Sequence, residues 1–438
     1  MVTLRQQNQN TPITGFQSRF VDVWWRLLLV TLVCICISCT SIQPACNTKP
    51  CRVKTVDSSQ INQRLILIGD AGKLTKKAGK GIKRKALLRA LRNYLTVVSE
   101  ATTIVFLGDN IYPHGLPDQD DFPIGQDTHC SKRACAEKRL NVQLDLLEQS
   151  GARGIFVPGN HDWDKAGKSG WRFIDNLQTY ILTQQQQRNI NVSLMPEHGC
   201  PGPSQVILPG LSSAKGVMLL LVDTQWWLHQ YDKPSQQNPA SCPAVTKQAV
   251  IQLLAQHIES ARRDHLHVII AGHHAFESNG KHAGYITMKG LSNPLQLLSG
   301  LRNRTPWASP QSLENPTYKA MRQQFETVFQ SAAERGLKSL IYAAGHDHSL
   351  QVLKSQQPGS SIYYLVSGLG SGTEYPVGSD SRTLFSRVSK QGGFMVVDYL
   401  KTGQIRLAVI VPTEKRAVCQ STKANCEVFS TWLPAGEV

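Results

Sequence analysis

Short apolar runs end in a glycine and then in polar residues at five places along the chain. Each run is rich in Val, Ile, Leu or Ala, and stretches with the apolar period of a helix follow several of them, including 83–99, 247–264 and 317–336. Continuous apolar strands that alternate with amphipathic helices are typical of a sheet buried on both faces. The five runs read RLILIGDAG, TIVFLGDNIY, GIFVPGNHD, HVIIAGHHAF and LIYAAGHDH.

Four further apolar runs differ, because they have turn residues and fewer helices between them. They predict a second sheet packed on the first, so the fold class is α/β, a two-sheet β-sandwich flanked by helices and forming a single domain. We expect a linker over 40–61, this domain over 62–412 and a cysteine-containing tail over 413–438. The four runs read VMLLLVDTQ, SIYYLVSGLG, GFMVVDYL and QIRLAVIV.

The N-terminal segment has the features of a secretory signal. Arg26 precedes an apolar run over 27–37, which ends in Ser38 and Cys39. This run has about half of the ~20 residues that span a bilayer, so the pattern predicts a signal peptide over 1–39. The small residue before Cys39 indicates a bacterial lipoprotein signal, in which that cysteine is lipidated. An uncleaved anchor or a buried helix start is the alternative. The expected location is outside the cytoplasm, in a Gram-negative periplasm, either lipid-anchored to a membrane or secreted.

Eight cysteines lie beyond this segment, in loop-like sequence. In an oxidising compartment an even number of such cysteines predicts disulfides, although the sequence leaves their connectivity open. Zinc binding is the alternative, but no CxxC pair occurs beyond the signal. The eight are Cys46, Cys51, Cys130, Cys135, Cys200, Cys242, Cys419 and Cys426.

The chain is basic, with a formal net charge of +16 in an otherwise ordinary composition of 41% hydrophobic and 18% charged residues. Such a charge attracts anions, among them phosphate esters, nucleic acid and acidic membrane surfaces. Part of it is concentrated in KLTKKAGKGIKRK, residues 73–85. A solvated loop and helix face is the alternative interpretation of that run.

The polar residues at the five strand ends predict one shared site, because ligands of such sheets gather at the carboxyl ends of strands. Carboxylate, amide oxygen and imidazole together suit first-row divalent and trivalent metals, whereas magnesium prefers oxygen and water. Two neighbouring metals can hold both oxygens of a phosphoryl displacement. Asp109, at the end of a central strand, is the natural ligand to bridge them.

These motifs resemble the calcineurin-like metallophosphoesterases and, within them, the purple acid phosphatases. The resemblance covers roughly residues 62–411. Much of the broader superfamily has Asp-x-His in the first motif, where this chain has Asp70-Ala71-Gly72. In purple acid phosphatases a tyrosine of the second motif compensates, and GDNIY supplies Tyr112 there.

The resemblance implies a dinuclear centre of Fe(III) with Zn, Fe or Mn. His161 matches a histidine that contacts substrate phosphate, and His282 resembles a second cleft histidine; either would protonate the leaving group. His274 stands where a cleft aromatic would be expected. The implied iron ligands are Asp70, Asp109, Tyr112 and His348, and the implied ligands of the divalent ion are Asp109, Asn160, His273 and His346.

The activity implied is that of an acid phosphatase, which hydrolyses phosphate monoesters by attack of a metal-bound hydroxide. Its substrates would be small phosphate esters or phosphoproteins. A phosphodiesterase or nucleotide pyrophosphatase with the same metals is the alternative within the superfamily. A surface-attached binding protein for nucleic acid or acidic polymer is the alternative from another class. No motif of the usual nucleic-acid modules occurs, so no specific nucleic acid is expected, and a membrane is expected only through Cys39.

Overall fold

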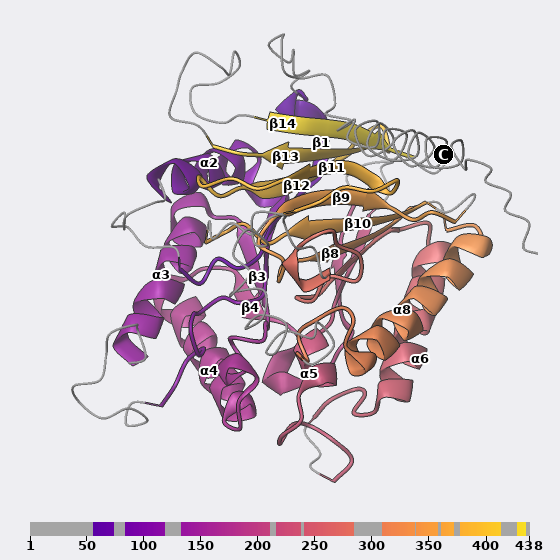
Figure 1. Ribbon diagram of the computed structural model, residues 1–438. Coiled ribbons are helices and arrows are strands. Elements are labelled where there is room, and N and C mark those ends of the chain that lie inside the picture. The colour runs from indigo at the N-terminus through magenta and orange to yellow at the C-terminus, as the bar shows by residue number, and fades with distance from the viewer. Residues whose placement is uncertain are drawn as a thin grey trace, which may run out of the picture. The chain divides into compact units, whose positions relative to one another are not determined.

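The computed structural model describes residues 56–73, 84–118, 133–210, 216–237, 241–283, 309–337, 339–357, 361–371, 377–412 and 427–434 (Figure 1). The segment 1–39 with Cys39, most of the 40–61 linker and most of the basic run over 73–85 lie outside the described residues. The same holds for five of the cysteines, Cys46, Cys51, Cys130, Cys419 and Cys426.

The first sheet has seven strands in the order β14-β13-β12-β1-β2-β3-β4. Its centre is parallel, since β1 pairs with β2, β2 with β3 and β3 with β4 in the same direction, whereas β12, β13 and β14 are antiparallel to their neighbours. The strands are β1 (Ile61–Ile68), β2 (Thr102–Leu107), β3 (Arg153–Val157), β4 (Val192–Leu194), β12 (Phe394–Leu400), β13 (Ile405–Ile410) and β14 (Glu427–Leu433).

The second sheet also has seven strands, in the order β11-β9-β10-β8-β7-β6-β5. Here β6, β7, β8 and β10 are parallel, and β5, β9 and β11 are antiparallel to their neighbours. The strands are β5 (Ser204–Leu208), β6 (Val217–Leu221), β7 (His267–Ala271), β8 (Leu340–Ala344), β9 (Leu350–Lys354), β10 (Ile362–Ser367) and β11 (Thr383–Arg387).

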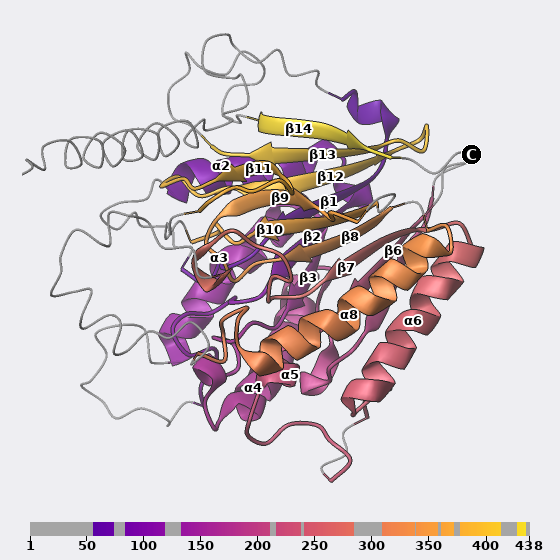
Figure 2. The ribbon, with the colours of Figure 1, turned by 45° about the vertical axis from the view of Figure 1, so that its right-hand side comes forward.

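Helices cover the outer face of each sheet (Figures 1 and 2). The helices α2, α3 and α4 lie on the side of the first sheet, and α6 and α8 on the side of the second. The α/β sandwich with flanking helices predicted from the sequence is thereby confirmed. The α-helices are α2 (Arg84–Val97), α3 (Arg133–Ser150), α4 (Gly170–Arg188), α5 (Thr224–Leu228), α6 (Lys247–Arg263) and α8 (Pro316–Glu334). Short 3-10 helices are Ser58–Gln60, Ser99–Ala101, Asp164–Ala166, Glu197–Gly199 and Lys281–Ala283.

The expected division of strands between the sheets was wrong. The five motif-bearing runs were expected in one sheet and the four later runs in another. Instead β1, β2 and β3 lie in the first sheet with β12 and β13, and β7 and β8 lie in the second with β6 and β10. Both sheets have a parallel centre buried on both faces, so the apolar pattern of their strands is the same and does not reveal the partner.

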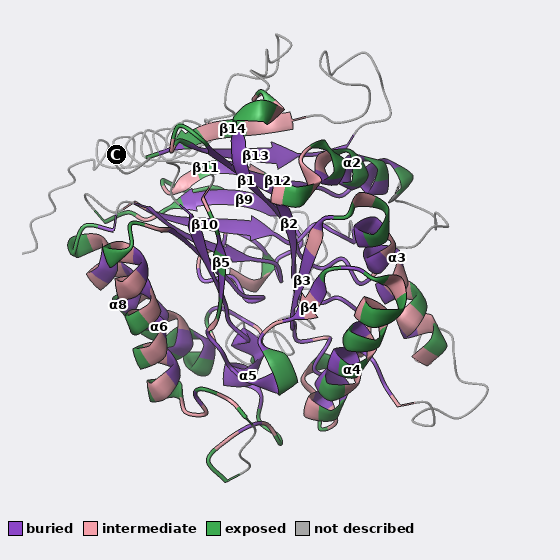
Figure 3. Cartoon of the chain, turned by 180° about the vertical axis from the view of Figure 1, so that it is seen from behind, coloured by how far each residue is buried: buried purple, intermediate pink, exposed green. Residues whose placement is uncertain are grey.

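Two apolar layers hold the sandwich together, because alternate strand residues point to opposite faces. In β1, Leu65 and Leu67 pack between the sheets, whereas Ile66 and Ile68 pack under the helices. Figure 3 shows this burial: the strands are buried (purple), and the helices that flank them have exposed outer faces (green). Other residues between the sheets include Val105, Leu107, Leu219, Ile269 and Ala343.

Strand β14 comes from the segment assigned to the C-terminal tail. It pairs with β13 from Ile405↔Leu433 to Ile410↔Glu427, and thus forms an edge of the first sheet. Part of that segment therefore belongs to the sandwich. None of the helices in the described part of the chain is long and apolar enough to cross a membrane.

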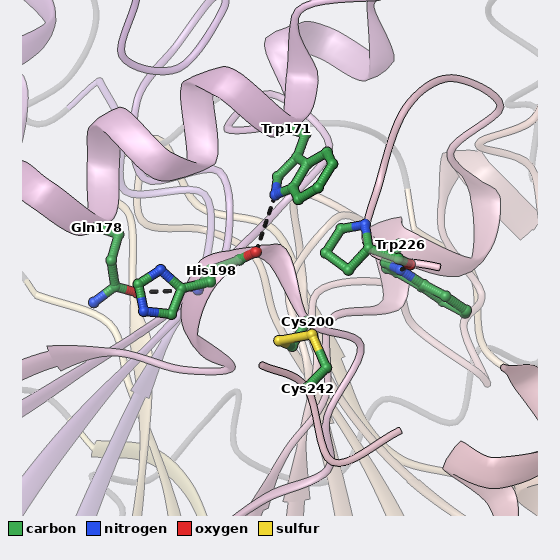
Figure 4. Close-up of a disulfide and its surroundings, with 7 residues drawn as sticks. Trp171, Gln178, His198, Cys200, Trp226 and Cys242 are labelled. Carbon is green, nitrogen blue, oxygen red and sulfur yellow. Dashed lines mark hydrogen bonds between the residues drawn. A yellow bond between two sulfur atoms is a disulfide. The ribbon is translucent and has the colours of Figure 1, made fainter. Parts of the chain in front are cut away.

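A disulfide joins Cys200 to Cys242 with a Cα–Cα distance of 5.5 Å (Figure 4). Beside it, Trp171 Nε1 of α4 donates a hydrogen bond to the carbonyl oxygen of His198 at 3.0 Å. Cys135 is disulfide-bonded as well. Disulfides persist in oxidising compartments, so these bonds are consistent with a location outside the cytoplasm.

Candidate metal centre

The polar residues that follow β1, β2 and β8 adopt an unusual backbone conformation. Asp70, Asp109 and His346 have φ values of 58°, 54° and 67°, in the left-handed region that non-glycine residues rarely occupy. Gly108, with φ of 84°, is required where it stands, since a Cβ there would lie 2.5 Å from Nδ1 of His273. The strand ends thus turn their polar side chains sharply toward one another, and strain of this kind is concentrated at functional sites.

Asp70, Tyr112 and His348 form the first donor cluster. The Tyr112 hydroxyl lies 2.8 Å from Oδ1 of Asp70 and 3.1 Å from Nε2 of His348. The distance between Asp70 Oδ1 and His348 Nε2 is also 3.1 Å. Three side chains from the ends of β1, β2 and β8 thus direct their donor atoms at one point.

Asn160, His273 and His346 form the second donor cluster. His273 Nε2 lies 3.0 Å from Oδ1 of Asn160 and 3.3 Å from Nδ1 of His346. Asp109 lies beside this cluster, with its Oδ1 3.4 Å from His273 Nε2, and it also hydrogen-bonds Tyr112 of the first cluster. All seven residues that the motifs assigned to metal are therefore near one another, with Asp109 between the two clusters.

The donor set suits cations. Donor atoms of Asp70, Asp109 and His273 lie within 4.8 Å of one another in a fully buried environment, as do those of His273, His274 and His346. Buried carboxylates need compensating charge. These buried His and Asp groups are consistent with a dinuclear metal site.

The charges of the buried groups also favour a bound cation. Burial would raise the pKa of Asp109, but the neighbouring His273 and His161 outweigh it and lower the pKa to about 2. The carboxylate is therefore ionised. Burial and the charges of Asp109 and Asp70 raise the pKa of Tyr112 well above its ordinary value. A cation beside these groups would offset the repulsion between the two carboxylates and an ionised Tyr112.

The two histidines assigned to proton transfer lie beside different cluster residues. The His161 ring is 4.3 Å from the Tyr112 ring, and its Nε2 is 3.8 Å from Oδ2 of Asp109. The His282 ring is 4.0 Å from that of His346. Both are therefore near the donor clusters.

Two buried carboxylates have roles that the motifs did not reveal. Asp162 accepts hydrogen bonds from the backbone N–H groups of Asn110, Ile111 and Gly159 and from the Asn110 side chain, and so joins the loops after β2 and β3. Asp347 accepts from Ser278 Oγ and from the backbone N–H of His282. Both residues stand in the quoted motifs, but only the hydrogen bonds identify them as loop anchors.

A polar pocket of about 460 Å³ opens beside the segment that carries His282. Arginine and glutamate side chains share its walls, so the lining does not select one ligand charge. The lining residues are Glu277, Ser278, Asn279, Ala283, Leu313, Glu314, Arg322 and Arg382.

No protein-family model and no curated protein matches the chain. Solved structures do match. GAP50, described as the anchor in the inner membrane complex of Plasmodium, has a TM-score of 0.50 at 15% identity, over 86% of this chain and 90% of its own. A purple acid phosphatase from yellow lupin has a TM-score of 0.45 at 13% identity, over 79% of this chain and 51% of its own. A dimetal phosphatase from Danio rerio has a TM-score of 0.45 at 12% identity, over 86% of this chain and 100% of its own.

At these identities the likeness concerns the fold. The chain shares its overall fold with GAP50, and buried His and Asp groups occupy its strand ends. Because one of the matched proteins is described as an anchor, the fold alone does not identify an activity.

Proposed function

We propose that this chain is a phosphomonoesterase with a dinuclear metal centre. The observation that carries the proposal is the convergence of seven donors into two buried clusters with Asp109 between them. Fe(III) is assigned to Asp70, Asp109, Tyr112 and His348. A divalent Zn, Fe or Mn ion is assigned to Asp109, Asn160, His273 and His346. When bound, two such ions would neutralise phosphate charge and make water a nucleophile at mild pH.

The protein's own groups would orient the phosphate and move the protons. Lys73 places its ammonium group 4.6 Å from the centre of the Tyr112 ring, so a positive charge lies beside the first cluster and favours an anionic substrate. Water loses a proton to the solvent and attacks phosphorus, the bond from phosphorus to the alcohol oxygen breaks, and that oxygen takes a proton from the imidazolium of His161 or His282.

The fold similarity supports this proposal only through the architecture, and the donors distinguish it from a non-catalytic anchor or binding protein. A binding protein needs no buried carboxylates and imidazoles directed at two common points. Substrates would be small phosphate esters or phosphoproteins.

We also propose that residues 1–39 direct export, that Cys39 is lipidated and attaches the protein to a membrane, and that 62–412 form the catalytic domain, to which β14 adds an edge strand. The Cys200–Cys242 disulfide supports export, because such bonds are rare in reducing compartments.

The test compares phosphate release from an aryl monophosphate with aryl alcohol release from a bis-aryl phosphate, using metal-replete protein that begins at residue 40. We expect turnover of the monoester to exceed that of the diester at least tenfold. Asp109→Asn serves as the blank. Preference for the diester would replace the proposal with a phosphodiesterase, and no turnover of either ester would contradict a hydrolase.

A further inference from the structure

The imidazole of His346 is fixed by a partner outside the motifs. Its Nε2 lies 2.9 Å from the backbone carbonyl oxygen of Gln311, and its Nδ1 lies 3.3 Å from Nε2 of His273. A carbonyl oxygen only accepts hydrogen bonds, so Nε2 must carry the proton and Nδ1 presents its lone pair to the second cluster. His273 is oriented in the same manner, since its Nδ1 lies 2.8 Å from the carbonyl oxygen of Leu107.

Leu107 belongs to a strand, but Gln311 lies in a turn and needs other support. Its Oε1 lies 2.6 Å from Nε2 of His274, and its Nε2 donates to Oε1 of Gln225 at 3.2 Å. The His274 ring is fully buried, and its Nδ1 lies 2.8 Å from Oγ1 of Thr224. Thr224, at the start of α5, is thus connected through His274 and Gln311 to His346.

We propose that His274 and Gln311 are positioning residues that hold the tautomer and direction of His346 for metal binding. The inference rests on the proposed function. It also explains why a histidine stands where a cleft aromatic was expected, because an aromatic hydrocarbon ring would give Gln311 no hydrogen bond.

The competing arrangement makes His274 a ligand, since its donor atoms lie within 4.8 Å of those of His273 and His346. Both of its ring nitrogens are already engaged, one by Thr224 and the other by Gln311. Binding a metal would break one of these contacts, whereas Nδ1 of His346 already faces the cluster. The geometry therefore favours positioning over ligation.

The experiment compares His274→Leu, which removes the hydrogen bond to Gln311, with His274→Gln, whose amide reaches the same place. Metal-stripped protein is titrated with Zn²⁺ against a chelating indicator. Loss of an outer hydrogen-bond partner costs about 10–100-fold in metal affinity. We expect that loss at one of two sites in His274→Leu and in Gln311→Met, and binding within about threefold of wild type in His274→Gln.

Tyr318→Phe is the matched control, because the Tyr318 ring packs 5.4 Å from His274 while its hydroxyl bonds Ala275 and not Gln311. It should lower the melting temperature without changing zinc affinity. If His274→Gln loses zinc as His274→Leu does, His274 is a ligand and the proposal is wrong. If His274→Leu binds two zinc ions with the affinity of wild type, the positioning role is wrong, whereas the proposed function stands.

A second readout needs no metal. In protein labelled with ¹⁵N at histidine, we expect His346 to be the Nε2–H tautomer in wild type and His274→Gln, and a mixture of tautomers in His274→Leu. An unchanged His346 spectrum in His274→Leu would overturn the positioning role of His274 and Gln311. This readout works even if wild type binds no zinc. Failure of wild type to bind zinc would contradict the proposed function instead.

Discussion

The two donor clusters share Asp109 but differ in their chemistry and support. The first holds a carboxylate, a phenol and one imidazole, whose donor atoms contact one another directly. The second holds an amide and two imidazoles, and each imidazole is fixed from behind by a backbone carbonyl. Anionic oxygen donors favour a highly charged ion, whereas imidazoles suit zinc and similar divalent ions. Under the proposed assignment, the first cluster would select its ion by charge, and metal binding at the second would depend on the orientation of its imidazoles.

The largest effect on both clusters is expected from Asp109→Asn, which removes the carboxylate between them. We expect both ions to be lost and phosphatase activity to fall about a thousandfold or more, since metal ions supply several kcal/mol of catalysis. Elemental analysis and phosphate release measure the two effects. Asn160→Ala should empty only the second cluster. Retention of both ions in Asp109→Asn would show that Asp109 does not bridge them.

Tyr112→Phe tests the first cluster alone, through the visible colour of its iron. Tyrosinate bound to Fe(III) absorbs visible light, so iron-loaded wild type should be coloured and the variant bleached, with the divalent ion of the second cluster retained. A visible spectrum and a metal analysis on one sample decide this. A colourless, active, iron-loaded wild type would mean that Tyr112 does not bind iron.

Asp162→Asn weakens the support shared by both clusters. Asp162 accepts hydrogen bonds from backbone N–H groups, and the amide of Asn would turn its own N–H group toward them. We therefore expect a loss of about 1–3 kcal/mol in the free energy of unfolding of metal-free protein. Denaturant titration measures it. Asp118→Asn breaks an exposed pair with Arg172 and should change stability by about 0.5 kcal/mol or less. Equal stability of the two variants would contradict the role of Asp162.

A further effect lies outside both clusters, at Glu326 on α8. Burial raises the pKa of Glu326 to about 7, so the folded protein holds a proton that the unfolded chain releases above its ordinary value of 4.5. Stability from this group is complete below pH 4.5 and is lost as the pH rises through 7. Glu326→Gln mimics the protonated form, so its free energy of unfolding relative to wild type should rise by about 3 kcal/mol between pH 4 and pH 8. A constant difference between these pH values would contradict this pKa.

The sequence was sufficient for the fold class, and it placed the candidate donors at strand ends, because both depend on local patterns. Apolar strands that end in glycine and a polar residue locate Asp70, Asp109, Asn160, His273 and His346 without any tertiary contact. The division of strands between sheets was not predictable, since β2 in the first sheet and β7 in the second are both short and buried along their whole length. Neither was the role of Gln311, which lies outside every motif and reaches His346 only through the packing of a turn.

The separation of the motifs between two sheets has a consequence for how metal is acquired. The backbone N–H of His346 bonds Oδ2 of Asp70 across 276 positions of the chain, so neither cluster exists until both halves have folded and docked. A chain that crosses a membrane unfolded therefore has no preformed site in transit. Its ions would come from the compartment in which it folds, and the metal supply there, rather than intrinsic affinity alone, would determine which divalent ion fills the second cluster.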